Sequence, residues 1–180
     1  MVLVGLMGAG KTTIGRRIAA LLDRPFVDAD DELVERTGRT NREWFEQDGQ
    51  QAFRKAEAEL LHTLLDADES AVVATGGGVV IAEENRRRLA ADDVTVVWLH
   101  GEPAFLASRT KPKEHRPLLE GDPRETLERL FSEREGWYRE VADVVIDVQP
   151  AFLTESKPKD HLAQEVVAAI VNRRDRTASS

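Results

Sequence analysis

Five short runs of apolar residues alternate along this chain with longer segments whose apolar residues recur every three or four positions. Short continuous apolar runs are typical of strands that are buried on both faces of a sheet. Strands that alternate with helices predict an α/β fold in three layers, with a five-stranded, mainly parallel sheet between two layers of helices. The predicted strands are Val2–Val4, Phe26–Val27, Ala71–Ala74, Val94–Leu99 and Val144–Val148.

Polar residues mark where several of the helices begin. Thr40, followed three residues later by Glu43, fits a capping box. Asp122 fits the N-cap position of a second such helix start, and Pro123 follows it at the first helical position, where proline is favoured. Pro158 marks the start of the last helix, and we expect the stretch before it, Gln149–Lys157, to be irregular.

Three charged residues lie where helical periodicity predicts an apolar face. In the helix expected from about Gln50 to Leu65, Glu57 falls within the apolar stripe and Arg54 borders it. Arg134 falls on the apolar face of the helix that starts at Pro123. A buried guanidinium is destabilising unless it is paired or binds an anion. Each arginine therefore indicates an anion site, a structural salt bridge, or a long side chain that reaches solvent.

A glycine loop at Gly5–Thr12 fits the phosphate-binding pattern G-x-x-x-x-G-K-S/T. It follows the first predicted strand and opens a segment with helical spacing, which is the context that this loop requires. Backbone N–H groups and the helix N-terminus would hold phosphate oxygens, with Lys11 on the β- and γ-phosphates and Thr12 on Mg²⁺. The alternative is a glycine-rich turn without a ligand.

Two further polar motifs follow predicted strands, where ligands bind in open α/β sheets. Asp28 and Asp30 follow the second strand, and alternate residues of an extended segment point the same way, so we expect both to face one site. The alternative is a cluster of N-cap residues for the next helix. The triplet Gly76–Gly78 follows the third strand and predicts close approach of a ligand to the backbone, or else a plain turn.

The segment from 110 to 120 has no strand or helix periodicity, and it contains two prolines and four basic residues if His115 is counted. It is either a solvated linker or a mobile lid that brings a cation to transferring phosphates.

Composition bounds the remaining possibilities. A length of 180 residues suits a single domain over 1–180, and 41% apolar with 32% charged residues is ordinary for a globular protein. No apolar run approaches the roughly 20 residues of a membrane span, and no basic leader precedes the first strand, so we expect no membrane contact. The net charge of −8 argues against nucleic-acid binding, and the absence of cysteine fits a cytoplasmic protein, which we expect to be monomeric.

Taken together, these motifs resemble the shikimate kinase family over nearly the whole chain. The loop alone is shared by many families, whereas the order and spacing of the whole set are specific. The motifs that carry the resemblance are Gly5–Thr12, Asp28-Ala29-Asp30, Asp48-Gly49 with Phe53-Arg54, Gly76–Gly78, Arg116-Pro117-Leu118-Leu119, and Arg134 with Trp137-Tyr138.

The resemblance implies a P-loop kinase fold with a helical substrate-binding region at about 31–62 and a mobile lid at about 110–120. It implies ATP as co-substrate, Mg²⁺, and phosphorylation of the shikimate 3-hydroxyl. The catalytic residues would be Asp30, Lys11 and Arg116, and the metal site would be Thr12 with Asp28. The implied ATP contacts are Gly8, Ala9, Gly10, Lys11, Thr12, Thr13, Arg109 (along the adenine) and Arg116.

For shikimate, the resemblance implies that Arg54 and Arg134 grip the carboxylate together with the backbone of the glycine triplet. Phe45 and Phe53 would wall the pocket, and Glu57 would brace Arg54. The full implied set is Asp30, Phe45, Phe53, Arg54, Glu57, Gly76, Gly77, Gly78 and Arg134.

Two other functions remain open from the sequence. One is another small-molecule kinase of this fold, such as a gluconate kinase, because a polyhydroxy acid would also need an arginine grip. Asp30, the glycine triplet and Arg116–Leu119 argue against it. The other is a regulatory module that binds nucleotide but catalyses no reaction. Loss of Lys11, Asp30 or the arginines would indicate such a module, and this chain retains all of these residues.

Overall fold

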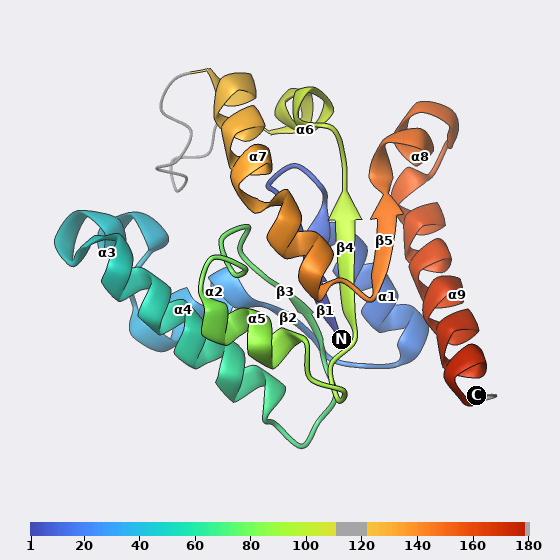
Figure 1. The fold of residues 1–180 in the computed structure, drawn as a ribbon, viewed down its shortest axis with the longest axis horizontal. Coiled ribbons are helices and arrows are strands. Elements are labelled where there is room, and N and C mark those ends of the chain that lie inside the picture. Colours follow the sequence, from blue (N-terminus) through green and yellow to red (C-terminus); the bar gives the residue numbers. More distant parts are fainter. Residues whose placement is uncertain (111–121, 179–180) are drawn as a thin grey trace.

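The computed structural model describes residues 1–110 and 122–178, and its centre is a parallel sheet. Five strands are hydrogen-bonded in the order β2-β3-β1-β4-β5, and every neighbouring pair is parallel (Figure 1). The predicted runs are all strands, which confirms the α/β fold, although their ends move by up to two residues. The strands are β1 (Val2–Val4), β2 (Phe26–Asp28), β3 (Val72–Ala74), β4 (Val96–His100) and β5 (Val144–Asp147).

Helices connect the strands and cover both faces of the sheet, as in a three-layer fold (Figure 1). Among the described residues, no helix combines the length and the apolar composition that a membrane-spanning segment requires. The helices are α1 (Lys11–Leu22), α2 (Ala29–Thr37), α3 (Asn41–Gln47), α4 (Gly49–Leu65), α5 (Glu83–Leu89), α6 (Pro103–Arg109), α7 (Pro123–Val141), α8 (Val148–Thr154) and α9 (Pro158–Ala178).

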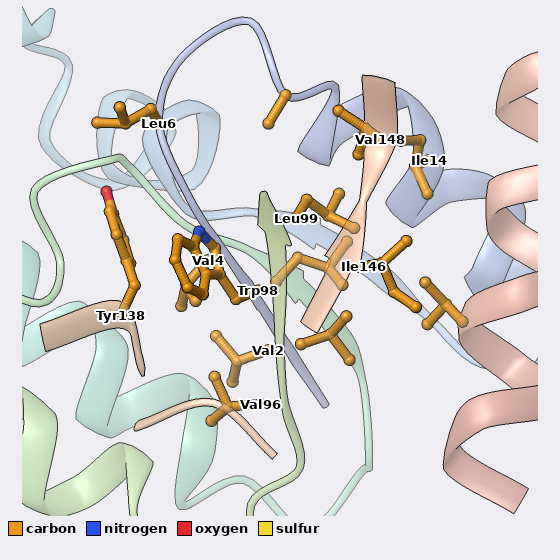
Figure 2. Close-up of a cluster of buried hydrophobic side chains, with 14 of the residues drawn as sticks. Val2, Val4, Leu6, Ile14, Val96, Trp98, Leu99, Tyr138, Ile146 and Val148 are labelled. Carbon is orange, nitrogen blue, oxygen red and sulfur yellow. The ribbon is translucent and has the colours of Figure 1, made fainter. Parts of the chain in front are cut away.

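The main core lies on both sides of the central strands, because successive side chains of a strand point to opposite faces. Figure 2 shows Trp98 on the same side of β4 as Tyr138 of α7, and Leu99 on the side of Ile14 from α1. All four side chains are almost fully buried. The packing fixes α1 and α7 against opposite faces of the sheet, with the glycine loop between β1 and α1.

Helices α2, α3 and α4 stand together beside the β2 edge of the sheet (Figure 1). They pack around a second, smaller apolar cluster that includes Leu33, Phe53 and Leu60. The predicted substrate-binding region, 31–62, corresponds to these helices. This cluster gives the region a packing centre of its own.

The expected helix starts are confirmed. Thr40 and Glu43 form the reciprocal capping box of α3, and Asp122 caps α7 by accepting from the N–H of Arg124 at 2.8 Å. Helix α9 begins at Pro158.

Two local predictions are wrong. The stretch Gln149–Lys157 is not irregular throughout, because α8 occupies Val148–Thr154 and its N-terminus is capped by Asp147. Asp28 and Asp30 do not share an extended segment, because the chain turns into α2 at Ala29. The predicted lid, with Arg116, lies outside the described residues except for Thr110.

Candidate active site

A cleft of about 520 Å³ opens at the carboxyl ends of β1, β2 and β3. The segments that follow these three strands supply much of its lining, and residues of α3, α4, α6, α7 and α9 complete it. Ala9 does not line the cleft, because its side chain is fully buried. All other predicted site residues within the described ranges line it: Gly8, Gly10, Lys11, Thr12, Thr13, Asp28, Asp30, Phe45, Phe53, Arg54, Glu57, Gly76, Gly77, Gly78, Arg109 and Arg134.

The glycine loop has a backbone that only glycine adopts easily. Gly8 and Gly10 have φ angles of 87° and 92°, and a Cβ at Gly8 would lie 2.5 Å from the carbonyl oxygen of Leu106. The Lys11 ammonium donates to the carbonyls of Gly5 and Leu6 at 2.7 and 3.0 Å, which holds it across the loop. The loop therefore brings one cation and the N-terminus of a 12-residue helix to a single end of the cleft.

The hydroxyl oxygen of Thr12 and a carboxylate oxygen of Asp28 lie together beside this loop. The Thr12 hydroxyl donates to Asp28 Oδ2 at 2.6 Å, and Asp28 Oδ1 accepts the backbone N–H of Asp30 at 3.1 Å. Asp28 is thus the N-cap of α2, which was one of the two alternatives drawn from the sequence. It also lines the cleft, as the other alternative expected. Hydroxyl and carboxylate oxygens suit Mg²⁺, which usually completes its shell with water and phosphate oxygens. No group of three or more acidic or histidine ligands accompanies them within the described ranges.

Arg54 and Glu57 form a buried ion pair that lies over the glycine triplet. Arg54 Nη1 is 2.7 Å from Glu57 Oε2, and the two side chains are 14% and 7% exposed. A Cβ at Gly78 would overlap the Arg54 guanidinium, and one at Gly76 would lie 2.7 Å from Glu57 Oε1 and 3.0 Å from Asp30 Oδ1. The triplet is therefore more than a plain turn, because its missing side chains give room to three charged groups of the cleft.

The ion pair leaves polar atoms unsatisfied inside the protein. Arg54 Nε and Glu57 Oε1 are buried and find no hydrogen-bond partner within the described residues. The pKa of Glu57 is raised because burial disfavours the carboxylate, although Arg54 beside it acts in the opposite direction. Unpaired buried polar atoms in a cleft are free to bind a polar ligand.

Arg134 reaches the same part of the cleft from α7. Its side chain is buried, its Nη1 donates to the carbonyl of Gly77 at 3.1 Å, and its Nε has no partner among the described residues. It forms no ion pair with any described carboxylate, so a structural salt bridge does not explain it. Burial, and to a smaller extent the charge of Arg54, lower the pKa of Arg134. Arg134 is buried and Arg54 is partly buried, and their like charges repel each other, so an anion between them would be favoured by both.

Arg109, at the end of α6, lies on the glycine-loop side of the cleft. Its Nε donates to the carbonyl of Gly8 at 3.1 Å, and its guanidinium stacks on Phe152 of α8 with 3.4 Å to the ring centroid. Burial lowers its pKa. Arg109 is thus held as a flat, cationic surface next to the loop.

The family model for shikimate kinase matches residues 7–172. The chain belongs to the shikimate kinase family. The resemblance drawn from the motifs is therefore confirmed.

Relatives and solved structures agree with this family. The shikimate kinase of Dechloromonas aromatica (strain RCB) is 52% identical over 146 residues, which cover 81% of this chain and 79% of the relative. That of Marinomonas sp. (strain MWYL1) is 41% identical over 171 residues, or 94% and 91% of the two chains. The structure of shikimate kinase from Acinetobacter baumannii in complex with shikimate has a TM-score of 0.86 and 37% identity, and the match covers 96% and 92% of the two chains.

A gluconokinase from Sinorhizobium meliloti 1021 also matches, with a TM-score of 0.57 and 21% identity over 98% of this chain and 94% of the other. This likeness is one of fold alone.

In this member of the shikimate kinase family, five cleft residues were not among the predicted site residues: Met7, Arg16, Asn41, Thr75 and Lys159. Met7 lies within the predicted glycine loop and Thr75 directly precedes the glycine triplet, so both belong to motifs that the sequence marks. Arg16, Asn41 and Lys159 carry no such sequence signal. The side-chain oxygen of Asn41 is buried without a partner among the described residues, so it adds an unsatisfied acceptor to the α3 side of the cleft.

Proposed function

We propose that this protein transfers the γ-phosphoryl group of ATP to the 3-hydroxyl of shikimate, giving shikimate 3-phosphate and ADP. The observation that carries the proposal is a second anion site, Arg54 with Arg134, in the same cleft as the phosphate-binding loop. An ATP site needs one cluster of positive charge, and an acceptor with a carboxylate needs another. Relatives named shikimate kinase and a related structure in complex with shikimate support this acceptor.

On the acceptor side, Arg54 and Arg134 bind the carboxylate together with backbone groups of Gly76–Gly78. Phe45 and Phe53, whose ring centroids are 4.9 Å apart, wall the pocket with apolar surface. Glu57 holds Arg54 through the 2.7 Å ion pair, so the guanidinium is oriented before the substrate arrives. The region 31–62 is the part of this single domain that binds the acceptor.

On the nucleotide side, the residues Gly8–Thr13, Ala9 included, surround the phosphates with backbone N–H groups, and Lys11 neutralises charge on the transferred phosphoryl group. Thr12 and Asp28 hold Mg²⁺, directly or through water, and the metal supplies positive charge to the phosphate oxygens. Arg109 lies along the adenine. Arg116, from the lid at 110–120, completes the charge around the phosphates and helps exclude water.

Asp30 accepts the hydrogen bond of the 3-hydroxyl and orients that oxygen for attack. As the bond to phosphorus forms, the hydroxyl proton leaves toward this carboxylate, and ADP takes the electron pair of the broken bond. The remaining catalysis comes from positioning and electrostatic stabilisation.

A coupled assay of ADP release tests the proposal when the acceptors shikimate, gluconate and a nucleoside monophosphate are compared under the same conditions. We expect ATP- and Mg²⁺-dependent turnover with shikimate that far exceeds the rate without an acceptor. Turnover with gluconate but not shikimate would instead identify a gluconate kinase, and ADP binding without turnover of any acceptor would indicate a regulatory module.

A further inference from the structure

Tyr138 is a buried side chain that the proposed mechanism leaves without a role. It lies on α7, one helical turn after Arg134, and it is fully buried. Its hydroxyl donates to the carbonyl oxygen of Gly77 at 2.5 Å, and the same oxygen accepts Arg134 Nη1 at 3.1 Å. A carbonyl oxygen has two lone pairs, so these two donors fully engage it.

The tyrosine ring is held as firmly as its hydroxyl. It stacks on Trp98 of β4 with ring centroids 5.6 Å apart and an interplanar angle of 21°. Figure 2 shows the two rings side by side, with the Tyr138 hydroxyl at the end away from α7. Burial raises the pKa of Tyr138, so the hydroxyl remains a protonated donor.

The geometry links this rigid ring to the acceptor site through one peptide group. The Gly77 peptide lies in the middle of the triplet, between the glycines that Glu57 and Arg54 approach. Fixing its carbonyl fixes the orientation of the triplet backbone. It also fixes the position of Arg134, because Nη1 is bound to the same oxygen while Nε remains available within the cleft.

We propose that Tyr138 is a positioning residue for the acceptor carboxylate, acting through the Gly77 carbonyl on the triplet and on Arg134. This inference rests on the proposed function, because it assumes that the carboxylate binds beside Arg134. Without the hydroxyl, the Gly77 peptide can rotate, and the Arg134 guanidinium is no longer held in one place before the acceptor binds.

The variant Tyr138→Phe tests the inference, since it removes one oxygen atom and keeps the ring that stacks on Trp98. We expect KM for shikimate to rise by about tenfold, as for one lost hydrogen bond, with KM for ATP and the Kd of ADP within about twofold of the wild type. With the carboxamide of shikimate, whose acid group is neutral, the ratio of variant to wild-type KM should fall toward one. If Tyr138 had only a structural role, the ratio of variant to wild-type KM would be the same for shikimate and for its carboxamide.

Two further variants complete the design. Val166→Ala, in the core of α9 and away from the cleft, should lower Tm without changing KM for shikimate. Trp98→Phe keeps the hydroxyl but loosens the ring beneath it, and should raise the same KM by a smaller factor.

Three results for Tyr138→Phe would overturn the inference and leave the proposed function intact. They are a wild-type KM for shikimate, an equal rise of KM for shikimate and for ATP, and a variant-to-wild-type KM ratio that is the same for shikimate and its carboxamide. If Tyr138→Phe does not fold, an unchanged KM in Trp98→Phe overturns it instead. A wild-type enzyme that does not turn over shikimate would overturn both.

Discussion

A methyl group added at Gly78 would occupy space that the Arg54 guanidinium now fills. The guanidinium carbon and both terminal nitrogens of Arg54 are the nearest atoms to such a Cβ. Gly78 does not have a left-handed φ, so alanine introduces no backbone strain there. The substitution Gly78→Ala therefore moves one side chain, and its effect should appear in acceptor binding before it appears in folding.

The size of that effect follows from what Arg54 would lose. A displaced Arg54 gives up a charge-assisted hydrogen bond to the acceptor carboxylate, which is worth about 1.5–3 kcal/mol. Since each 1.4 kcal/mol corresponds to a factor of ten, KM for shikimate should rise by about 10- to 100-fold. KM for ATP should stay within about twofold, because Lys11 and the glycine loop do not contact Arg54.

Steady-state kinetics with each substrate varied in turn measures the two constants, and differential scanning fluorimetry measures Tm. Gly136→Ala is the matched control, because this exposed glycine of α7 has no atom within 4 Å of an added Cβ. It should leave both KM values unchanged and raise Tm by about 2–4 °C through helix propensity. Wild-type KM for shikimate in Gly78→Ala would refute the reasoning, as would an equal loss of shikimate and ATP binding.

Three other variants probe the site. Arg134→Ala should raise the Kd of shikimate by about tenfold or more and leave that of ADP within about twofold, as calorimetry would show; equal losses would instead support a structural role for Arg134. Asp30→Asn should lower kcat by about 100-fold or more while ADP still binds, and near-normal turnover would remove Asp30 from the chemistry. The raised pKa of Glu57 means that its ionisation favours unfolding as pH rises above its ordinary value of 4.5. Thermal melts of Glu57→Gln across a pH series should therefore show a flatter decline of Tm above that value than the wild type shows, and a steeper decline would contradict the assignment.

The central strands β1, β3 and β4 were predictable because they are buried on both faces, so that each run is continuously apolar. The edge strands β2 and β5 are partly exposed, yet they too begin with apolar residues. The charged residues on apolar helix faces were equally informative. Glu57 and Arg134 are buried, Arg54 is partly buried, and all three line one cleft.

Short helices and helix starts were not predictable in the same way. Helix α8 has only seven residues and contains Pro150, which sits in the first turn, where no intrahelical N–H bond is needed. Asp28 and Asp30 reach the cleft as an N-cap and a first-turn residue, because acidic side chains favour a helix N-terminus and the chain turns there.

Individual hydrogen bonds and packing contacts between distant segments were not predictable from the sequence. The hydroxyl of Tyr138 meets a carbonyl that lies 61 residues away, and no periodicity relates the two positions. The reason for glycine at Gly76 and Gly78 is of the same kind. It lies in side chains from α4 and α2 that approach the backbone, and only the folded arrangement reveals them.

The position of the transferred phosphate tests the central claim most directly. Purified protein is incubated with ATP, Mg²⁺ and shikimate, and the product is examined by correlated phosphorus and proton NMR. The account predicts a single phosphate ester whose phosphorus couples to the proton on carbon 3. Phosphorus coupled to the proton of another carbon, or ADP accompanied only by inorganic phosphate, would contradict it.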